Sequence, residues 1–372
     1  MHVWVMFRLV GLGGLAALWV AGVPLRAADY AGVDLRIPIA AQEGGSLEAV
    51  MVLPLGGGRH PLVILSHGSP REARDRPGMS ARGMMPQLVA FARRGFVAVS
   101  VLRRGYGTSV GPWAEGSGPC EKADYARSAR AGAADIRTAI AFMTRRDDVD
   151  ITRIVAVGQS AGGFATVALT ADPPSGLVAA ISFAGGRGSR PPDSVCDEDA
   201  LVRAFGTFGR RSHVPMLWIY TENDRYFGPA LARRFRAAFQ DSGGQVSFVA
   251  APAFGSDGHA LFSAPNGRDI WMPIVEAFLV RQGLHLPAVR PSTPSSLKPP
   301  KSLGAAGQAA FGTYLDSPGS RAFAVSATGG YGWRTGRVSA LEARDGALAN
   351  CARATGTICR LHAVDDAYVV DP

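Results

Sequence analysis

The stretch ITRIVAVGQSAGGFATVALTA, residues 151–171, joins an apolar run to a glycine-flanked serine and then to small apolar residues. The run before the serine has the length and composition of a buried strand, and the residues from 161 onward suit a helix. Glycine loses more chain entropy on folding than other residues and stabilises neither element. Gly158, Gly162 and Gly163 therefore indicate a sharp strand-to-helix turn, which would expose the hydroxyl of Ser160.

Residues 29–285 continue this alternation of apolar runs and helical patterns. The predicted strands are 47–54, 61–67, 96–102, 153–158, 177–185, 215–222 and 245–252. The predicted helices are 82–94, 124–144, 161–171, 228–240 and 270–282. Several runs are apolar without alternation, as in strands that are covered on both faces. The pattern predicts an α/β fold with a mostly parallel sheet and a site at the carboxyl ends of its strands.

The rest of the chain reads as a linker and a second unit. Residues 286–304 are rich in Pro, Ser and Lys and indicate a semi-extended linker. Residues 305–372 predict a small α+β unit, with strands in 321–327 and 359–370 and a helix in 337–352.

The N-terminus has the layout of a secretory signal peptide, predicted to span residues 1–28. Arg8 precedes an uncharged apolar stretch that is shorter than the ~20 residues of a membrane-spanning helix. Pro24 and small residues follow, and cleavage is expected near Ala27 or Ala28. A retained anchor is the alternative. After cleavage no stable membrane span is expected, and the protein would be periplasmic or secreted.

The charge argues against a nucleic-acid binder, and the cysteine content agrees with export. The net charge of +9 comes mainly from scattered arginines, without the clustered basic run of a nucleic-acid binder. Four cysteines in an exported chain suggest disulfides and allow three pairings. Nearness in sequence favours Cys351 with Cys359, which leaves Cys120 with Cys196. No cysteine has a second one two to four residues away, so a zinc site is not expected.

The pattern Gly-x-Ser-x-Gly occurs twice, around Ser109 and around Ser160. A nucleophile on such a turn needs a buried strand before it and a helix after it. Gly111 and Pro112 follow Ser109 and would hinder a helix. Context therefore favours Ser160 as the nucleophile. The alternative for Ser160 is a helix N-cap without catalytic function.

A serine nucleophile needs a base and an acid that orients the base, and both are expected after the serine in the chain. His259 lies in a glycine-rich loop directly after a predicted strand and is the expected base. Asp224 lies just beyond another strand and is the expected acid. Glu222 is the alternative acid, whereas Asp257 is too close in sequence to face the ring of His259. The other histidines precede the serine or lie away from the predicted site: His2, His60, His67, His213, His285 and His362.

Attack on a carbonyl also needs donors for the developing oxyanion. We expect the backbone N–H of Ala161, at the start of its helix, and that of Ser69, in the loop after the strand 61–67. The side chain of His67 is expected to hold that loop by a hydrogen bond.

Two irregular segments, 103–125 and 185–200, follow strands beside the predicted site. A Cys120–Cys196 bridge would join them into a rim. Tyr106 and Trp113 could line an acyl or alcohol pocket, or pack under the loop instead. Three arginines in these segments could attract a substrate carboxylate or be merely solvated: Arg103, Arg104 and Arg187.

The segments LSHGSP, LRRGYGTS, GQSAGG, YTENDRYF and DGHALF, in this order, resemble the α/β-hydrolase superfamily over residues 35–285. The resemblance is to dienelactone-hydrolase-like and prolyl-oligopeptidase-like serine hydrolases, and it implies an eight-stranded sheet and an acyl-enzyme mechanism. Dienelactone hydrolases usually carry a cysteine nucleophile, so their lactone substrate is not carried over. Prolyl oligopeptidases carry a large propeller before the hydrolase. Only ~10–20 residues separate the predicted signal peptide from the first predicted strand, too few for such a domain, so a size-gated peptidase is not expected. The C-terminal unit resembles small cysteine-paired appendages of exported bacterial proteins.

The sequence thus predicts an exported serine hydrolase, a carboxylic-ester hydrolase acting on small-molecule esters without metal or organic cofactor. A peptidase or amidase of the same fold is one alternative. A non-catalytic envelope binding protein, whose C-terminal unit docks on a partner, is the other.

Overall fold

The computed structural model describes Tyr30 and residues 32–40, 44–54, 57–286, 297–317, 320–337, 340–365 and 367–369. The predicted signal peptide and most of the predicted linker lie outside the described residues. Within these ranges, no helix combines the length and apolarity needed to cross a bilayer.

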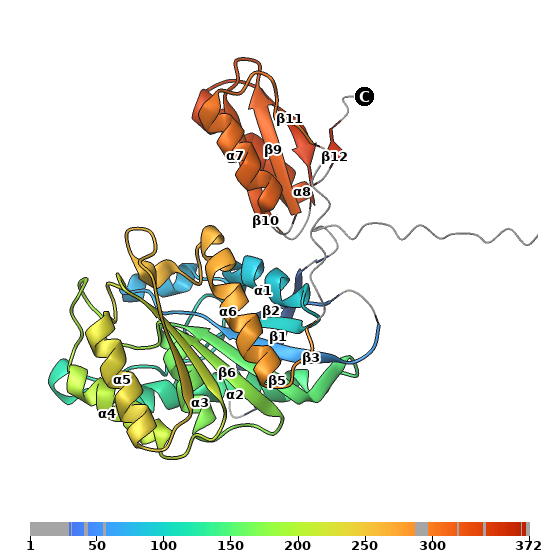
Figure 1. Ribbon diagram of the computed structural model, residues 1–372. Coiled ribbons are helices and arrows are strands. Elements are labelled where there is room, and N and C mark those ends of the chain that lie inside the picture. Colours follow the sequence, from blue (N-terminus) through green and yellow to red (C-terminus); the bar gives the residue numbers. More distant parts are fainter. Residues whose placement is uncertain are drawn as a thin grey trace, which may run out of the picture.

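The larger part of the molecule is built around a sheet of eight strands (Figure 1). The strand order is β1-β2-β4-β3-β5-β6-β7-β8. The β1–β2 and β2–β4 pairs are antiparallel, and the remaining pairs are parallel. The strands are β1 (Gly32–Pro38), β2 (Ser46–Val52), β3 (His60–Ser66), β4 (Val97–Leu102), β5 (Val149–Gln159), β6 (Leu177–Phe183), β7 (Met216–Thr221) and β8 (Val246–Ala251).

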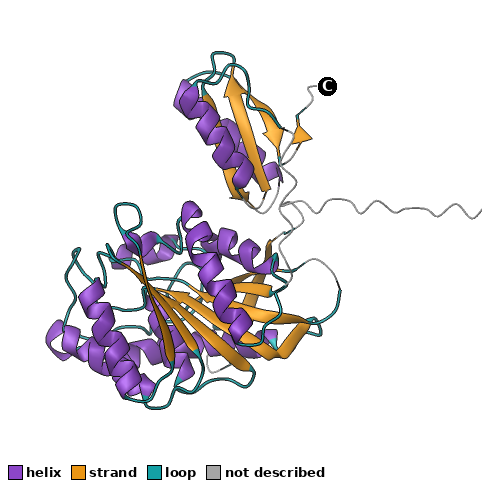
Figure 2. Ribbon diagram, in the orientation of Figure 1, coloured by secondary structure: helices purple, strands orange, loops and turns teal. Residues whose placement is uncertain are grey.

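Helices cover both faces of this sheet (Figure 2). Strand β3 shows why its sequence is continuously apolar: Leu62 and Ile64 belong to the core on one face, and Val63 and Leu65 to the core on the other. One face packs against α2 (Tyr125–Met143), α3 (Ala161–Thr170), α4 (Glu198–Gly209) and α5 (Pro229–Asp241). The other packs against α1 (Met85–Ala92) and α6 (Arg268–Arg281). The predicted α/β fold is confirmed.

The chain order reverses at β3, and this reversal positions the site. From β3 the chain continues to β4 on one side, and it later returns to place β5 on the other side. In open α/β sheets a crevice forms where the connections diverge in this way, at the carboxyl ends of the strands. The loops after β3 and β5 therefore meet there.

Among the described strands and α-helices around the eight-stranded sheet, two were not predicted. Strand β1 has a single buried side chain, Ile37, and so lacks the apolar run by which the other strands are recognised. Helix α4 begins inside the segment 185–200 that was expected to be irregular. Its signal is visible in retrospect: Asp197 caps the helix by accepting from the Ala200 N–H, and apolar residues follow at helical spacing.

The C-terminal unit is a separate four-stranded antiparallel sheet in the order β10-β9-β11-β12. Phe323 of β9 packs with Phe311 and Tyr314 of one helix, and its neighbour Ala322 packs with Ala347 of the other, so the unit has a helix on each face. Sequence analysis missed α7 and β10. The elements are α7 (Ala305–Asp316), β9 (Ser320–Ser326), β10 (Tyr331–Arg337), α8 (Ala340–Thr355), β11 (Cys359–Val364) and β12 (Ala367–Tyr368).

Candidate active site

Ser160 lies between β5 and α3, with no other residue separating the two elements. Its backbone φ of 54° and ψ of −122° are strained for a residue with a side chain. The flanking glycines make the turn possible, because a Cβ on Gly158 would lie 2.2 Å from the carbonyl oxygen of Gly162. A Cβ on Gly162 would lie equally close, 2.2 Å, to the carbonyl oxygen of Ser66. The glycines thus let the helix begin directly against β3 and β5.

Asp224 and His259 meet at the carboxyl edge of the sheet. The Nδ1 atom of His259 lies 3.1 Å from Oδ2 and 3.2 Å from Oδ1 of Asp224. A carboxylate only accepts, so Nδ1 carries the ring proton and Nε2 remains free to act as a base. The backbone N–H groups of Tyr226 and Phe227 donate to Oδ1 of Asp224 at 2.7 Å and 2.9 Å and fix the carboxylate.

The loop that carries His259 is held against the serine turn. The side-chain amide of Gln159, directly before Ser160, donates to the carbonyl oxygen of His259 at 2.9 Å. The ring of Tyr226 stacks on the imidazole with 3.8 Å between centroids. Asp257 accepts from the His259 backbone N–H at 3.0 Å, so it contacts the loop and not the ring. Among the described contacts, the Ser160 hydroxyl makes no hydrogen bond to the imidazole.

Sequence reasoning did not single out Gln159 or Tyr226 for these contacts. Both stand inside the quoted segments, next to Ser160 and two residues after Asp224. Their positions beside the expected nucleophile and acid are the signal that could have marked them.

The two residues expected to supply the oxyanion donors stand in segments next to Ser160. Ala161 is the first residue of α3, where backbone N–H groups have no intrahelical acceptor. The loop after β3 also passes close to this serine: a Cβ built on Gly68 would lie 3.9 Å from Oγ of Ser160. Ser69 follows directly in this loop. The geometry therefore brings a helix terminus and a second backbone segment to the nucleophile.

His67 is buried beneath this loop and holds it, as its expected structural role requires. The Arg103 backbone N–H donates to Nε2 of His67 at 3.0 Å, so the ring proton is on Nδ1, which donates to the Gly68 carbonyl oxygen at 2.6 Å. Burial, together with the charge of Arg103, lowers the pKa of His67 to about 3. The imidazole is therefore neutral in the folded protein at neutral pH.

This burial predicts a pH dependence of stability. The ordinary pKa of 6.5 applies in the unfolded chain, which therefore binds a proton that the folded protein excludes. The stability that His67 contributes is complete above that value and is lost as pH falls toward 3, by about 1.4 kcal/mol per pH unit. Urea unfolding of wild type and His67→Gln at several pH values checks this. Between about pH 6 and pH 4, the free energy of unfolding of the wild type should fall with pH more steeply than that of the variant, by the equivalent of about one bound proton. Equal slopes for the two proteins would contradict this prediction.

A cavity of about 580 Å³ opens beside the serine turn. It is lined by His67, Gly68, Pro70, Arg74, Asp75, Gly78, Met79, Ser80, Gly83, Met84, Gln87, Gln159 and Ser263. Tyr106 and Trp113, which could have lined a pocket, do not line this one. Tyr106 is fully buried, and Trp113 packs its ring under the Arg76 guanidinium at 3.6 Å.

The three arginines considered for substrate attraction are paired inside the protein. Arg103 and Arg187 both form ion pairs with the buried carboxylate of Glu115, and Arg104 pairs with Asp135. They are therefore not free to bind a substrate carboxylate. Nothing in the local sequence around Glu115 marked it as the partner, because the pairing depends on how two loops fold together.

Both disulfides pair as the sequence suggested. Cys120 is bonded to Cys196 and joins the loop before α2 to the loop before α4. Cys351 is bonded to Cys359 and joins α8 to β11.

Comparison with known proteins agrees with this architecture. The esterase 2 of Thermogutta terrifontis, solved after phosphorylation by paraoxon, superposes with a TM-score of 0.51 at 18% identity, covering 69% of this chain and 96% of its own. An esterase of Pyrococcus furiosus gives 0.50 at 12% identity, covering 73% and 99%. The acylaminoacyl peptidase of Pyrococcus horikoshii gives 0.50 at 18% identity, covering 68% of this chain but only 42% of its own. No curated protein matches the sequence significantly.

The chain has the fold of the α/β-hydrolase superfamily. The model of the X-Pro dipeptidyl-peptidase (S15) family matches residues 43–232, just over half of the chain. The protein belongs to this family.

Proposed function

We propose that this protein is a carboxylic-ester hydrolase that acts through an acyl-enzyme on Ser160. The observation that carries the proposal is the contact between the Asp224 carboxylate and Nδ1 of His259, in a loop tied to the strained serine turn. Asp224 holds the imidazole so that Nε2 can accept the Ser160 proton.

The chemistry follows in two halves. Oγ of Ser160 attacks the ester carbonyl carbon while His259 takes its proton, and the N–H groups of Ala161 and Ser69 stabilise the oxyanion. The C–O bond to the alcohol breaks, and the imidazolium protonates the leaving oxygen. Water, deprotonated by the same imidazole, then attacks the acyl-enzyme, and the acid is released as Ser160 regains its proton.

The cavity favours an ester over an N-terminal dipeptide. Release of a dipeptide from a peptide N-terminus requires the site to hold a terminal ammonium, for which carboxylates are the strongest acceptors. Among the described residues that line the cavity, Asp75 is the single carboxylate, and it is exposed to solvent. An ester makes no such demand on the site.

A peptidase or amidase is the second candidate, because the family match names a dipeptidyl-peptidase. A panel of p-nitrophenyl esters, assayed beside aminoacyl- and X-Pro-anilides, separates the two. We expect kcat/KM for the best ester to exceed that for the best anilide by about 100-fold or more. Faster cleavage of an X-Pro-anilide would assign the peptidase instead.

We also propose that the protein is exported. Two disulfides support this, since such bonds persist in oxidising compartments. Cell fractionation of the full-length chain tests it, with a version lacking residues 1–28 as the control. Recovery of both forms in the cytosol would refute export.

A further inference from the structure

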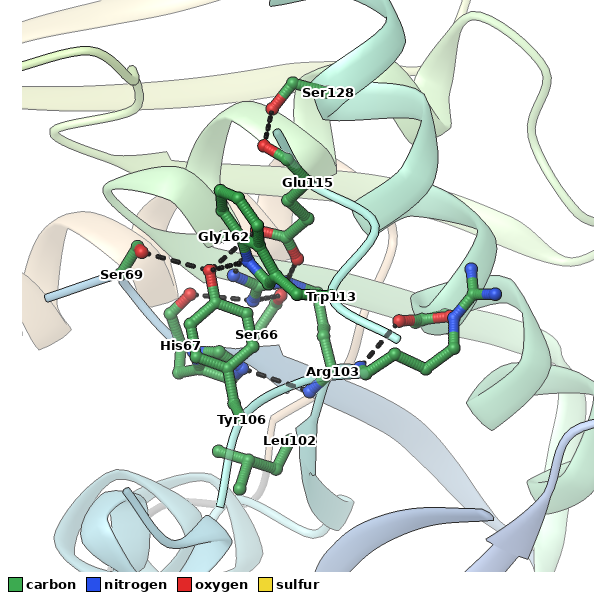
Figure 3. Close-up of polar contacts among 12 residues, drawn as sticks. Ser66, His67, Ser69, Leu102, Arg103, Tyr106, Trp113, Glu115, Ser128 and Gly162 are labelled. Atoms are coloured by element: carbon green, nitrogen blue, oxygen red, sulfur yellow. Dashed lines mark hydrogen bonds and ion pairs between the residues drawn. The ribbon is translucent and has the colours of Figure 1, made fainter. Parts of the chain in front are cut away.

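A cluster of buried charges lies beneath the loop after β3 (Figure 3). Arg103 has no exposed surface and Glu115 is 3% exposed. Nε of Arg103 and Nη2 of Arg187 both donate to the Glu115 carboxylate, the latter at 2.6 Å. Burial by itself would raise the pKa of Glu115, but the two guanidinium groups outweigh it and lower the pKa to about 2. The carboxylate is therefore charged throughout the neutral range.

Stability alone does not account for such a cluster. Taking charges out of water costs several kcal/mol per ion, and apolar residues of similar volume often serve a core equally well. Two positive groups share one carboxylate here, so the cluster keeps a net positive charge beneath the loop that passes Ser160. This suggests that the cluster serves the site and not only the core.

The cluster contacts the loop at several points. Nη1 of Arg103 donates to the carbonyl oxygen of His67 and to Oγ of Ser66, each at 2.7 Å. The hydroxyl of Tyr106 lies 3.0 Å from Oγ of Ser69 and 3.0 Å from Oε2 of Glu115. The loop is therefore anchored on both sides of Gly68, the residue that passes Ser160. Glu115 joins the two anchors, since both Arg103 and Tyr106 contact its carboxylate.

We propose that Glu115 is a positioning residue for the hydrolysis, which orients Arg103 and Tyr106 so that they hold the Ser69 N–H at the oxyanion. The inference rests on the proposed function, in which that N–H is the second oxyanion donor. Such a donor is effective only within a narrow range of distances from the oxygen, and loss of one donor typically costs about 100- to 1,000-fold in kcat. A small displacement of the loop should lower kcat by a smaller factor than loss of the donor. It should also affect kcat more than KM, because the donor acts on the transition state.

Two variants test this, each compared with wild type in kcat, KM and the rate constant for fluorophosphonate labelling of Ser160. Glu115→Gln removes the charge at constant size. Tyr106→Phe keeps the ring and removes the hydroxyl that lies between Glu115 and Ser69 and also accepts from Trp113 and Arg187. We expect kcat and the labelling rate to fall by about 10- to 100-fold with KM changed by less than about threefold. Labelling needs no knowledge of the natural substrate.

Ser109→Ala is the matched control. Ser109, like Arg103, lies in the segment after β4, but its hydroxyl is outside the cluster. The hydroxyl donates to the Leu102 carbonyl oxygen and accepts from the Glu48 N–H at 2.8 Å. Its loss should lower the unfolding temperature without changing the labelling rate of the folded protein.

The outcomes are distinguishable. Should Glu115→Gln fail to fold, Tyr106→Phe decides alone, because it keeps the ring and all three charged groups of the cluster. Wild-type labelling rates in the folded variants, or rates that fall only with the folded fraction, overturn the positioning role while leaving the proposed function intact. Absence of label on Ser160 in the wild type overturns the proposed function and this inference together.

Discussion

Replacing Ser160 by alanine is expected to lower ester turnover by about 10⁴- to 10⁶-fold, because no other hydroxyl stands on the strained turn between β5 and α3. The change removes one oxygen from a residue that is 7% exposed, and its backbone conformation already tolerates a Cβ. Stability should therefore change little. Steady-state kinetics on the best p-nitrophenyl ester, beside a thermal unfolding curve, measure both effects.

Ser109→Ala serves as the control here too, since Ser109 stands in the second Gly-x-Ser-x-Gly pattern. Its hydroxyl is committed to the Leu102 carbonyl oxygen and the Glu48 N–H, so it has a structural function. Peptide mapping after fluorophosphonate labelling should find the label on Ser160 in both wild type and this variant. A label on Ser109, or undiminished turnover in Ser160→Ala, would remove Ser160 from the mechanism.

Asp224→Asn is expected to lower kcat by about 10⁴-fold, the second largest effect. An asparagine oxygen can still accept from the Tyr226 and Phe227 N–H groups, which hold Oδ1 in the wild type. The amide nitrogen then replaces Oδ2 and donates toward Nδ1 of His259. The ring proton moves to Nε2, and the imidazole can no longer take the proton of Ser160.

Glu222→Gln is the matched control for that variant. Glu222 stands two residues earlier, is exposed, and was the alternative acid in the sequence. Its amide should leave kcat within about twofold of wild type. If Glu222→Gln were the impaired enzyme and Asp224→Asn the active one, the acid would have to be reassigned.

The sequence predicts an order of serine, acid and histidine because each of the three candidates stands in a short local pattern. Ser160 follows a buried strand and precedes a helix, and Asp224 and His259 each follow a strand. Parallel strands end at one edge of a sheet, so these positions were expected to converge. In the structure, Nδ1 of His259 contacts the carboxylate of Asp224, 35 positions away in the chain.

Elements without a strong local period escaped prediction. Within the described residues, strand β1 is mostly exposed and stands at the edge of the sheet beside β2, and β10 carries glycines and arginines in place of an apolar run. Both are strands because a neighbouring strand offers them hydrogen bonds, which a window of sequence does not reveal.

By itself, the sequence determined the α/β class, the strained serine turn and the chain order of the expected catalytic residues, since strand and helix periods and turn glycines act over a few neighbouring positions. Only the tertiary structure decided which charges are buried and which aromatic rings reach a cavity. Arg103 and Glu115 look like ordinary surface residues in the sequence, yet both are buried and paired with each other, and Glu115 is also paired with Arg187. Burial of a side chain depends on what packs above it, and that packing comes from distant parts of the chain.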